Sequence, residues 1–180
     1  MSFILEKEGL LRRIIPGGFL LAMLGPWSFD LVGVPAQFAC NGLSVRLAGD
    51  FCGFPVSVFG GGIMVSINLF RALVRGTPAS SLRPELTALV IVLCIFLPFF
   101  SSFALIRKKN SRRTQVINII LLVLGGIAAL VMLAMQLNRP QVAPVIYLVW
   151  GAWLYILVAM SAIVLEVMVL RVNAKPDLAM

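Results

Sequence analysis

The sequence contains no histidine and few charged residues. None of its 180 residues is histidine and only 12% are charged, whereas soluble domains carry about 25% charged residues. Histidine is the usual axial ligand of haem and a common ligand of zinc, copper and non-haem iron, so its absence argues against sites for these groups. It also excludes catalytic triads that use an imidazole base. We therefore expect neither a metal nor an organic cofactor.

Motifs of other enzyme classes are missing as well. The sequence has no Asp-x-x-Asp pair, no C-x-x-C pair and no nucleophile elbow, which are the short motifs that carry metal, redox or acyl-transfer chemistry. We therefore predict no catalytic residues and a protein that is not an enzyme.

Acidic residues are scarcer than basic ones, with 7 Asp and Glu against 15 Lys and Arg and a net charge of +8. In a soluble protein this excess would indicate nucleic-acid binding. Here 61% of the residues are hydrophobic, and several basic residues lie directly beside long apolar runs, as the positive-inside rule predicts for membrane spans. We therefore expect membrane lipids as partners, and no nucleic acid.

Four apolar segments are predicted to cross the membrane, at about residues 14–27, 86–106, 116–137 and 142–170. About 20 apolar residues suffice for a crossing, so the first segment is short, and the last is long enough to tilt or protrude. A basic region before a short apolar run also fits a signal peptide, with Val34-Pro35-Ala36 as a poor cleavage site. We expect a signal-anchor helix instead, with Pro16 in its first turn.

Residues 51–70 are apolar enough to span, but Gly53, Pro55 and the glycines at 60–62 interrupt them. With four spans, ten of the basic residues lie inside and five outside; with a fifth span the division is eight against seven. The stronger bias favours four spans, both termini in the cytoplasm and an outer segment at 28–85. Within that segment, residues 61–75 are predicted to form an amphipathic or re-entrant helix on the outer membrane face.

Two of the three cysteines, Cys40 and Cys52, fall in the predicted outer segment. Between them, Asn41-Gly42 is a turn signal and residues 43–47 alternate, which is typical of a small β-hairpin. A disulfide between the two cysteines would staple this loop and would require an oxidising compartment. A free, reactive pair is the alternative. Together these features predict an all-α membrane protein, a single domain of four helices with a disulfide-stapled outer loop.

Glu166 is the only acidic residue well inside an apolar run, and an intramembrane ionisable group is a candidate functional site. Because Arg171 is close in sequence, Glu166 could instead reach the interface, and an internal polar partner is a third interpretation. Two other polar residues, Asn118 and Gln136, lie at opposite ends of the third span and are interpreted as interfacial.

Several residues of the outer segment are candidates for interaction. Trp27 is interpreted as an interfacial aromatic residue at the end of the first span, and Asp30 as a partner for Arg46 or Arg83.

The order of these features resembles that of the claudin-like tetraspan family, with four spans, internal termini and a long first outer loop. The matching positions are Trp27 near the start of that loop, the pair Cys40 and Cys52, and Arg83 just before the second span. The second tryptophan of the family's loop is missing here, and the last outer loop is nearly absent. The resemblance implies lateral association through the outer loop, or service as an accessory subunit.

We therefore expect an accessory, assembly or interaction subunit of a larger complex in the plasma or cytoplasmic membrane, with other integral membrane proteins as partners. The polar residues are few and are not expected to converge on a midplane site of the kind that transporters need. The alternative is a small homo-oligomeric channel or transporter subunit, with Glu166, Asn118 or Ser101-Ser102 lining its path.

Overall fold

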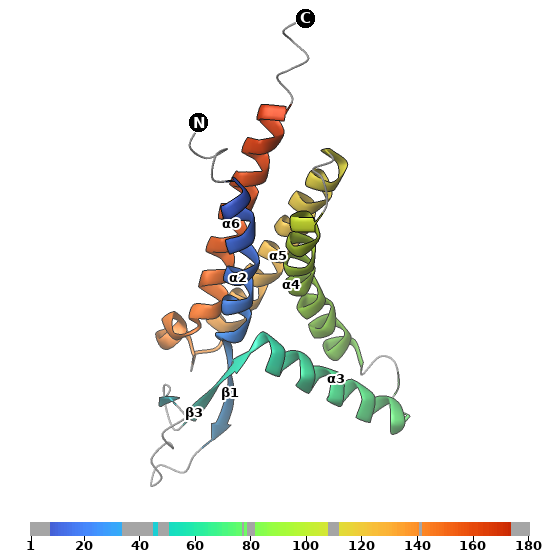
Figure 1. Ribbon diagram of the computed structural model, residues 1–180. Helices are drawn as coiled ribbons and strands as arrows, with labels where there is room; N and C mark the ends of the chain where they lie inside the picture. Colours follow the sequence, from blue (N-terminus) through green and yellow to red (C-terminus); the bar gives the residue numbers. More distant parts are fainter. Residues whose placement is uncertain are drawn as a thin grey trace, which may run out of the picture.

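The computed structural model describes residues 8–33, 45–46, 51–76, 78, 82–107, 112–140 and 142–173. The elements in order are α2 (Glu8–Leu24), β1 (Pro26–Gly33), β2 (Val45–Arg46), β3 (Phe51–Ser57), α3 (Val58–Val74), α4 (Arg83–Arg107), α5 (Arg112–Leu137), the 3-10 helix η2 (Ala143–Leu148) and α6 (Trp150–Asn173). Most of the chain is helical, and a small sheet lies at one end of the helical bundle (Figure 1).

Three helices, α4, α5 and α6, are long and apolar enough to cross a membrane, which is consistent with an integral membrane protein. Each has at least 24 residues, and at about 1.5 Å per residue this exceeds the roughly 30 Å of the hydrocarbon core. Helix α2 packs along α6 as a fourth member of the bundle (Figure 1) but has only 17 residues. The structure therefore confirms three of the predicted spans by length and composition, and not the fourth.

The bounds of the first and last predicted spans are wrong. The first helix begins at Glu8 and ends at Leu24, so Pro16 lies in its interior and not in its first turn. Residues 142–170 do not form one helix, because η2 ends at Leu148 and α6 begins at Trp150. A proline sits at the start of η2, where its missing N–H costs no helical hydrogen bond. Once η2 is separated, α6 has an ordinary spanning length.

A three-stranded antiparallel sheet in the order β1-β3-β2 follows α2. The short strand β2 lies inside the alternating run at 43–47 and pairs with β3, with Arg46 opposite Cys52. A small hairpin is therefore confirmed, whereas the predicted turn at Asn41-Gly42 lies outside the described residues. The longer partner of β3 is β1, where Phe29 lies opposite Pro55. Sequence analysis missed β1 because its aromatic start resembled the interfacial end of a membrane helix.

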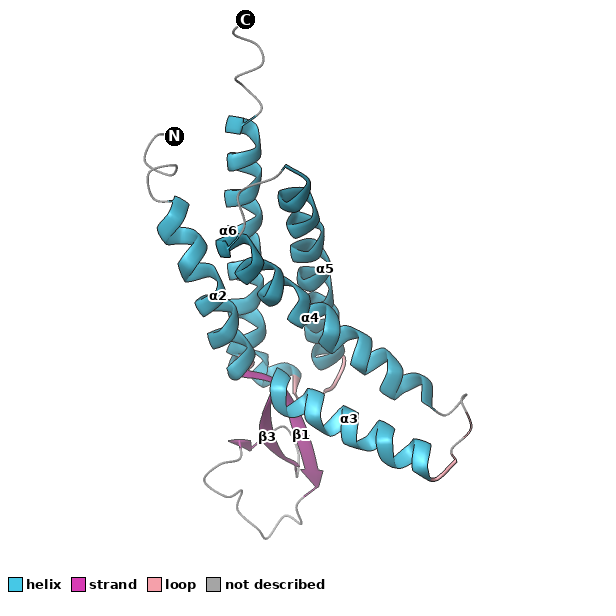
Figure 2. Cartoon of the chain, turned by 45° about the vertical axis from the view of Figure 1, so that its right-hand side comes forward, coloured by secondary structure: helices cyan, strands magenta, loops and turns pink. Residues whose placement is uncertain are grey.

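Residues 51–70 are divided between β3 and α3. The hydroxyl of Ser57 accepts a hydrogen bond from the backbone N–H of Gly60 and so caps the start of α3. Gly76, at a φ of 66°, follows the end of the helix. Helix α3 leaves the bundle at the sheet end and packs against α4 (Figure 2). The predicted helix at 61–75 is therefore confirmed, with an earlier start at Val58, and its 17 residues are too few for a spanning helix.

Small residues allow close packing inside the bundle. A Cβ on Gly125 of α5 would lie 2.5 Å from both the Pro98 ring of α4 and the Tyr155 hydroxyl of α6. The same hydroxyl donates to the carbonyl of Ile95, 2.9 Å away, close to the break that Pro98 makes in the α4 ladder. Gly125 thus marks the point where α4, α5 and α6 approach most tightly.

Candidate functional site

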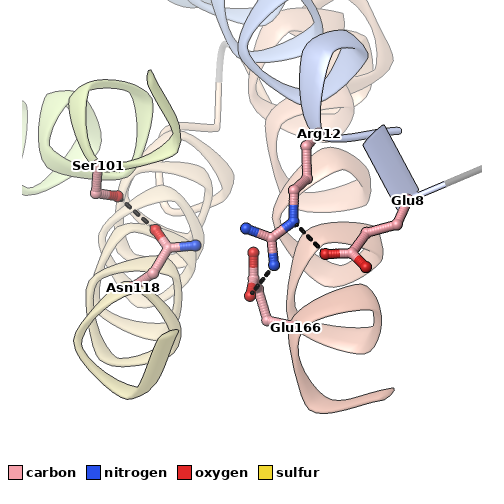
Figure 3. Close-up of polar contacts among 5 residues, drawn as sticks. All are labelled: Glu8, Arg12, Ser101, Asn118 and Glu166. Carbon is pink, nitrogen blue, oxygen red and sulfur yellow. Dashed lines mark hydrogen bonds and ion pairs between the residues drawn. The ribbon is translucent and has the colours of Figure 1, made fainter. Parts of the chain in front are cut away.

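Glu166 of α6 forms an ion pair with Arg12 of α2 inside the bundle. One Arg12 amino group lies 3.1 Å from the Glu166 carboxylate, and Arg12 Nε lies 2.9 Å from Glu8 (Figure 3). The exposed fractions are 2% for Glu166 and 8% for Arg12. Of the three interpretations of Glu166, the internal partner is the one observed. That partner comes from the first helix, and not from the nearby Arg171.

A second pair lies beside the first. The hydroxyl of Ser101 on α4 is 2.6 Å from the Asn118 amide oxygen on α5, and the Asn118 amide nitrogen points toward Arg12 and Glu166 (Figure 3). Asn118 is buried between helices, and its interpretation as an interfacial residue stays a prediction. Four helices contribute polar side chains to this one cluster, which lies near the start of α2 and α5 and the end of α6. The expectation that no midplane site forms stays a prediction.

The cluster encloses little empty space. The cavity lined by Arg12, Ser102, Asn118 and Glu166 has a volume of about 10 Å³, which is room for about one water molecule. Ser102 donates its own hydrogen bond to the carbonyl of Pro98. The polar side chains therefore bond chiefly to the bundle itself, an arrangement that fixes the packing of α2 on α6 and leaves little space for a transported ion.

The position of the cluster follows from helix geometry. Arg12 lies close to the start of α2, Asn118 close to the start of α5, and Glu166 close to the end of α6. Because α2 and α5 start at the end of the bundle where α6 finishes (Figure 1), these three side chains come together. At about 1.5 Å per residue, the cluster lies roughly 10 Å from the ends of α5 and α6, remote from the sheet.

Trp27 lies at the opposite end of the bundle and is not an interfacial residue. Its side chain is 1% exposed, its indole N–H donates to the carbonyl of Ala22 at 2.7 Å, and its ring packs edge-on against Tyr155. Phe19 covers the other side of Tyr155. Trp27 therefore attaches the sheet to the bundle core and presents no surface to a partner.

The other predicted outer residues are dispersed. Asp30 and Arg46 lie on β1 and β2, on either side of the central strand, and Arg83 is exposed at the start of α4. Cys52 lies on β3, whereas Cys40 falls outside the described residues. The predicted disulfide therefore stays a prediction, and no ion pair of Arg83 is found in the part of the chain that the structure describes.

A larger surface feature lies at the sheet end. A groove of about 260 Å³ runs between β1, β3, α3, α4 and α5. Its lining includes Gln136, which is buried, and Arg139, whose guanidinium donates to the carbonyl of Phe29 at 3.4 Å. Gln136 lies one residue before the end of α5, so its predicted interfacial position stays a prediction. Helix α3 forms one wall and extends beyond it with an exposed apolar face.

Comparison with known proteins identifies no relative of this chain. No protein-family model, curated sequence or solved structure matches this chain. The resemblance to claudin-like tetraspan proteins therefore stays a prediction, and the function has to be inferred from the geometry.

Sequence reasoning missed Arg12 and Gln136 as buried residues. Arg12 shares the buried stripe of α2 with Pro16, Phe19 and Met23, spaced three or four residues apart as one helix face requires. Gln136 continues the buried stripe of α5 in the same way. A polar residue in phase with such a stripe is the signal that could have identified both.

Proposed function

We propose that this chain is a non-enzymatic integral membrane protein that serves as an accessory or assembly subunit, and that it docks another integral membrane protein on the outer face of α3. The observation that carries the proposal is an apolar stripe on α3, made of Ile63, Ile67, Phe70 and Val74. These side chains are 44–71% exposed.

The two faces of α3 differ in what covers them. The seam formed by Val58, Gly62, Val65, Leu69 and Ala72 is buried or half-buried, and its alternating spacing of four and three residues is that of a face packed on a neighbouring helix. The stripe lies on the opposite side and continues for about three turns. Contiguous exposed apolar surface of this kind marks interaction sites on proteins.

The position of α3 favours a protein partner that is itself embedded in the membrane. The helix is too short to cross, lies at the end of the spanning helices (Figure 2), and carries Arg71 and Arg75 near its C-terminus. A partner can therefore meet the stripe with an apolar surface near the membrane boundary and pair these two guanidinium groups with acidic residues. A helix that only rests on lipid is the competing outcome of the test.

The predicted outer location belongs to this proposal. With both termini in the cytoplasm of a plasma or cytoplasmic membrane, the sheet and α3 face outward, and a Cys40–Cys52 disulfide staples the loop beside β2. A membrane-impermeant thiol reagent, applied to intact cells after reduction, should label both cysteines. Labelling only after the cells are opened would contradict the orientation.

A small homo-oligomeric channel is the second candidate, because Glu166, Asn118 and Ser102 line one cavity. Vesicles that contain the purified chain would show an ion or proton flux in this case, and the variant Glu166→Gln would abolish it. The subunit proposal expects no flux from either protein.

The subunit proposal is tested by purification from the native membrane in mild detergent. We expect one set of membrane proteins at a fixed ratio to the wild-type chain, and loss of that set from the variant Phe70→Ser. The matched control is Leu157→Ser on α6, since the two side chains are similarly exposed, at 68% and 62%. A wild-type chain that purifies alone, or equal loss in both variants, would contradict the proposal.

A further inference from the structure

The groove at the sheet end combines apolar walls with three polar lining residues, Ser28, Gln136 and Arg139. Val92 of α4, Val65 of α3 and Met132 of α5 are among its wall residues. Gln136 and Arg139 lie four and seven residues beyond Met132 along the chain. Met64 and Met135 form part of the rim and are about half exposed. The groove is thus open toward the surface that would face lipid.

Gln136 is the first sign that the groove holds a polar ligand group. The side chain is 4% exposed, and its Oε1 has no hydrogen-bond partner among the described residues. Leaving a buried amide oxygen unpaired costs about 1–3 kcal/mol. A hydroxyl or amide donor on a bound molecule would remove this penalty.

Arg139 is the second sign. Its Nη1 donates to the carbonyl of Phe29, and no carboxylate pairs with its guanidinium in the described ranges. A guanidinium carries five N–H donors in a fixed fork that suits phosphate oxygens. The side chain therefore presents a positive charge and spare donors beside the groove.

The volume suits an acyl chain. An apolar cavity of about 150 Å³ holds a benzene molecule, so a groove of about 260 Å³ accommodates several methylene groups. Three methionines, Met64, Met132 and Met135, line it, and their flexible thioethers adapt to a chain of variable shape.

We propose that the groove binds one anionic phospholipid whose headgroup carries hydroxyl groups, of the phosphatidylglycerol type. An acyl chain lies along Val92 and Met132, the phosphate contacts Arg139, and a headgroup hydroxyl donates to Oε1 of Gln136. This site is independent of the outer stripe of α3 and of the partner proposed for it.

The test is native mass spectrometry of the full chain in neutral detergent, with phosphatidylglycerol or phosphatidylcholine of identical acyl chains added. We expect one phosphatidylglycerol to bind about fivefold more tightly than phosphatidylcholine, the contribution of one basic residue near a lipid headgroup. Arg139→Gln should remove this preference. Gln136→Leu should lower the affinity for phosphatidylglycerol by a further few-fold. Ala88→Phe, which fills the groove, should lower the affinity for both lipids.

Two control variants isolate the groove. Arg75→Gln removes an exposed positive charge on α3, and Ala134→Phe adds the same bulk to an exposed position of α5; neither lines the groove, and both should bind like the wild type. Because the Arg139 side chain is exposed, the Arg139→Gln variant is expected to fold. It therefore tests the proposal even if the Ala88→Phe variant does not fold.

Three outcomes with the wild type and the arginine variants would overturn the proposal, and a fourth concerns Ala88→Phe. They are equal binding of the two lipids by the wild type, an equal effect of Arg75→Gln and Arg139→Gln, and displacement of the lipid by glycerol phosphate, which has no acyl chain. Unchanged binding in a folded Ala88→Phe variant would do the same.

Discussion

Removing the charges of the Arg12–Glu166 pair one at a time should show how the first helix is held to the last. In the variant Arg12→Leu, Glu166 keeps its buried position without its guanidinium partner, and Glu8 loses its contact as well. Breaking a buried pair on one side costs about 3–5 kcal/mol in soluble proteins, and a charged residue at the centre of a membrane helix costs about 2.5–3.5 kcal/mol. We therefore expect the free energy of unfolding to fall by about 3 kcal/mol.

The reverse variant should cost less. In Glu166→Leu, Arg12 retains the Glu8 carboxylate, which lies 2.9 Å from its Nε, so the remaining charge is still paired. We expect a loss of about 1–2 kcal/mol, smaller than that of Arg12→Leu because the surviving pair limits the desolvation penalty. In the double variant the buried pair is absent, and the one charge left at this contact is that of the partly exposed Glu8. Stability should therefore return to within about 1 kcal/mol of the wild type.

The measurement is a double-mutant cycle. The unfolding equilibrium of each variant is measured in bicelles by steric trapping. A coupling free energy of about 2 kcal/mol or more between the two sites would support the pair, since contacting residues couple by about 0.5–3 kcal/mol. If the losses of the two single variants simply added in the double variant, the reasoning from the buried pair would be refuted.

Two further predictions concern the close approach of the spanning helices. Gly125→Ala places a methyl group 2.5 Å from the Pro98 ring and the Tyr155 hydroxyl, so the thermal unfolding midpoint should drop by an amount that corresponds to about 1–3 kcal/mol. Gly126→Ala has no neighbour within 4 Å of the new methyl group and should not destabilise the protein. Tyr155→Phe removes the hydrogen bond to α4 and should cost about 0.6–1.5 kcal/mol, whereas Tyr147→Phe, at an exposed position, should cost nothing measurable. Equal effects within either pair of variants would contradict the packing described here.

The three long apolar helices could be predicted because each apolar run is long, contains at most one charged residue and is bounded by basic or turn residues. The start of α2 could not, because Glu8, Arg12 and Arg13 look like a solvated flank in the sequence. The contact with Glu166, which lies 154 residues away, and the pair with Glu8 in the same helix make a helix that contains Arg12 favourable inside the bundle. Tertiary pairing therefore moved the helix boundary against the local pattern.

Prediction of the sheet from the local sequence was limited in a similar way. The turn signal and alternation near Val45 predicted a small hairpin, but the long strand β1 begins with Pro26 and Trp27, a pattern that also fits the end of a membrane helix. Its pairing with β3 joins segments about 25 residues apart, and no local sequence pattern predicts that register. The sequence named Glu166, Asn118 and Ser101-Ser102 as candidates for a path, but it did not identify Arg12, which pairs with Glu166.

Site-specific photocrosslinking at Phe70 tests the proposed docking face most directly. A photoreactive amino acid replaces Phe70 on α3 in living cells, and the same substitution at Leu157 on α6 is the control, since both side chains are exposed. The subunit proposal predicts that Phe70 crosslinks to one defined membrane protein and that Leu157 crosslinks to lipid. Lipid adducts alone at both positions would show that α3 rests on the membrane, and would contradict a docking role.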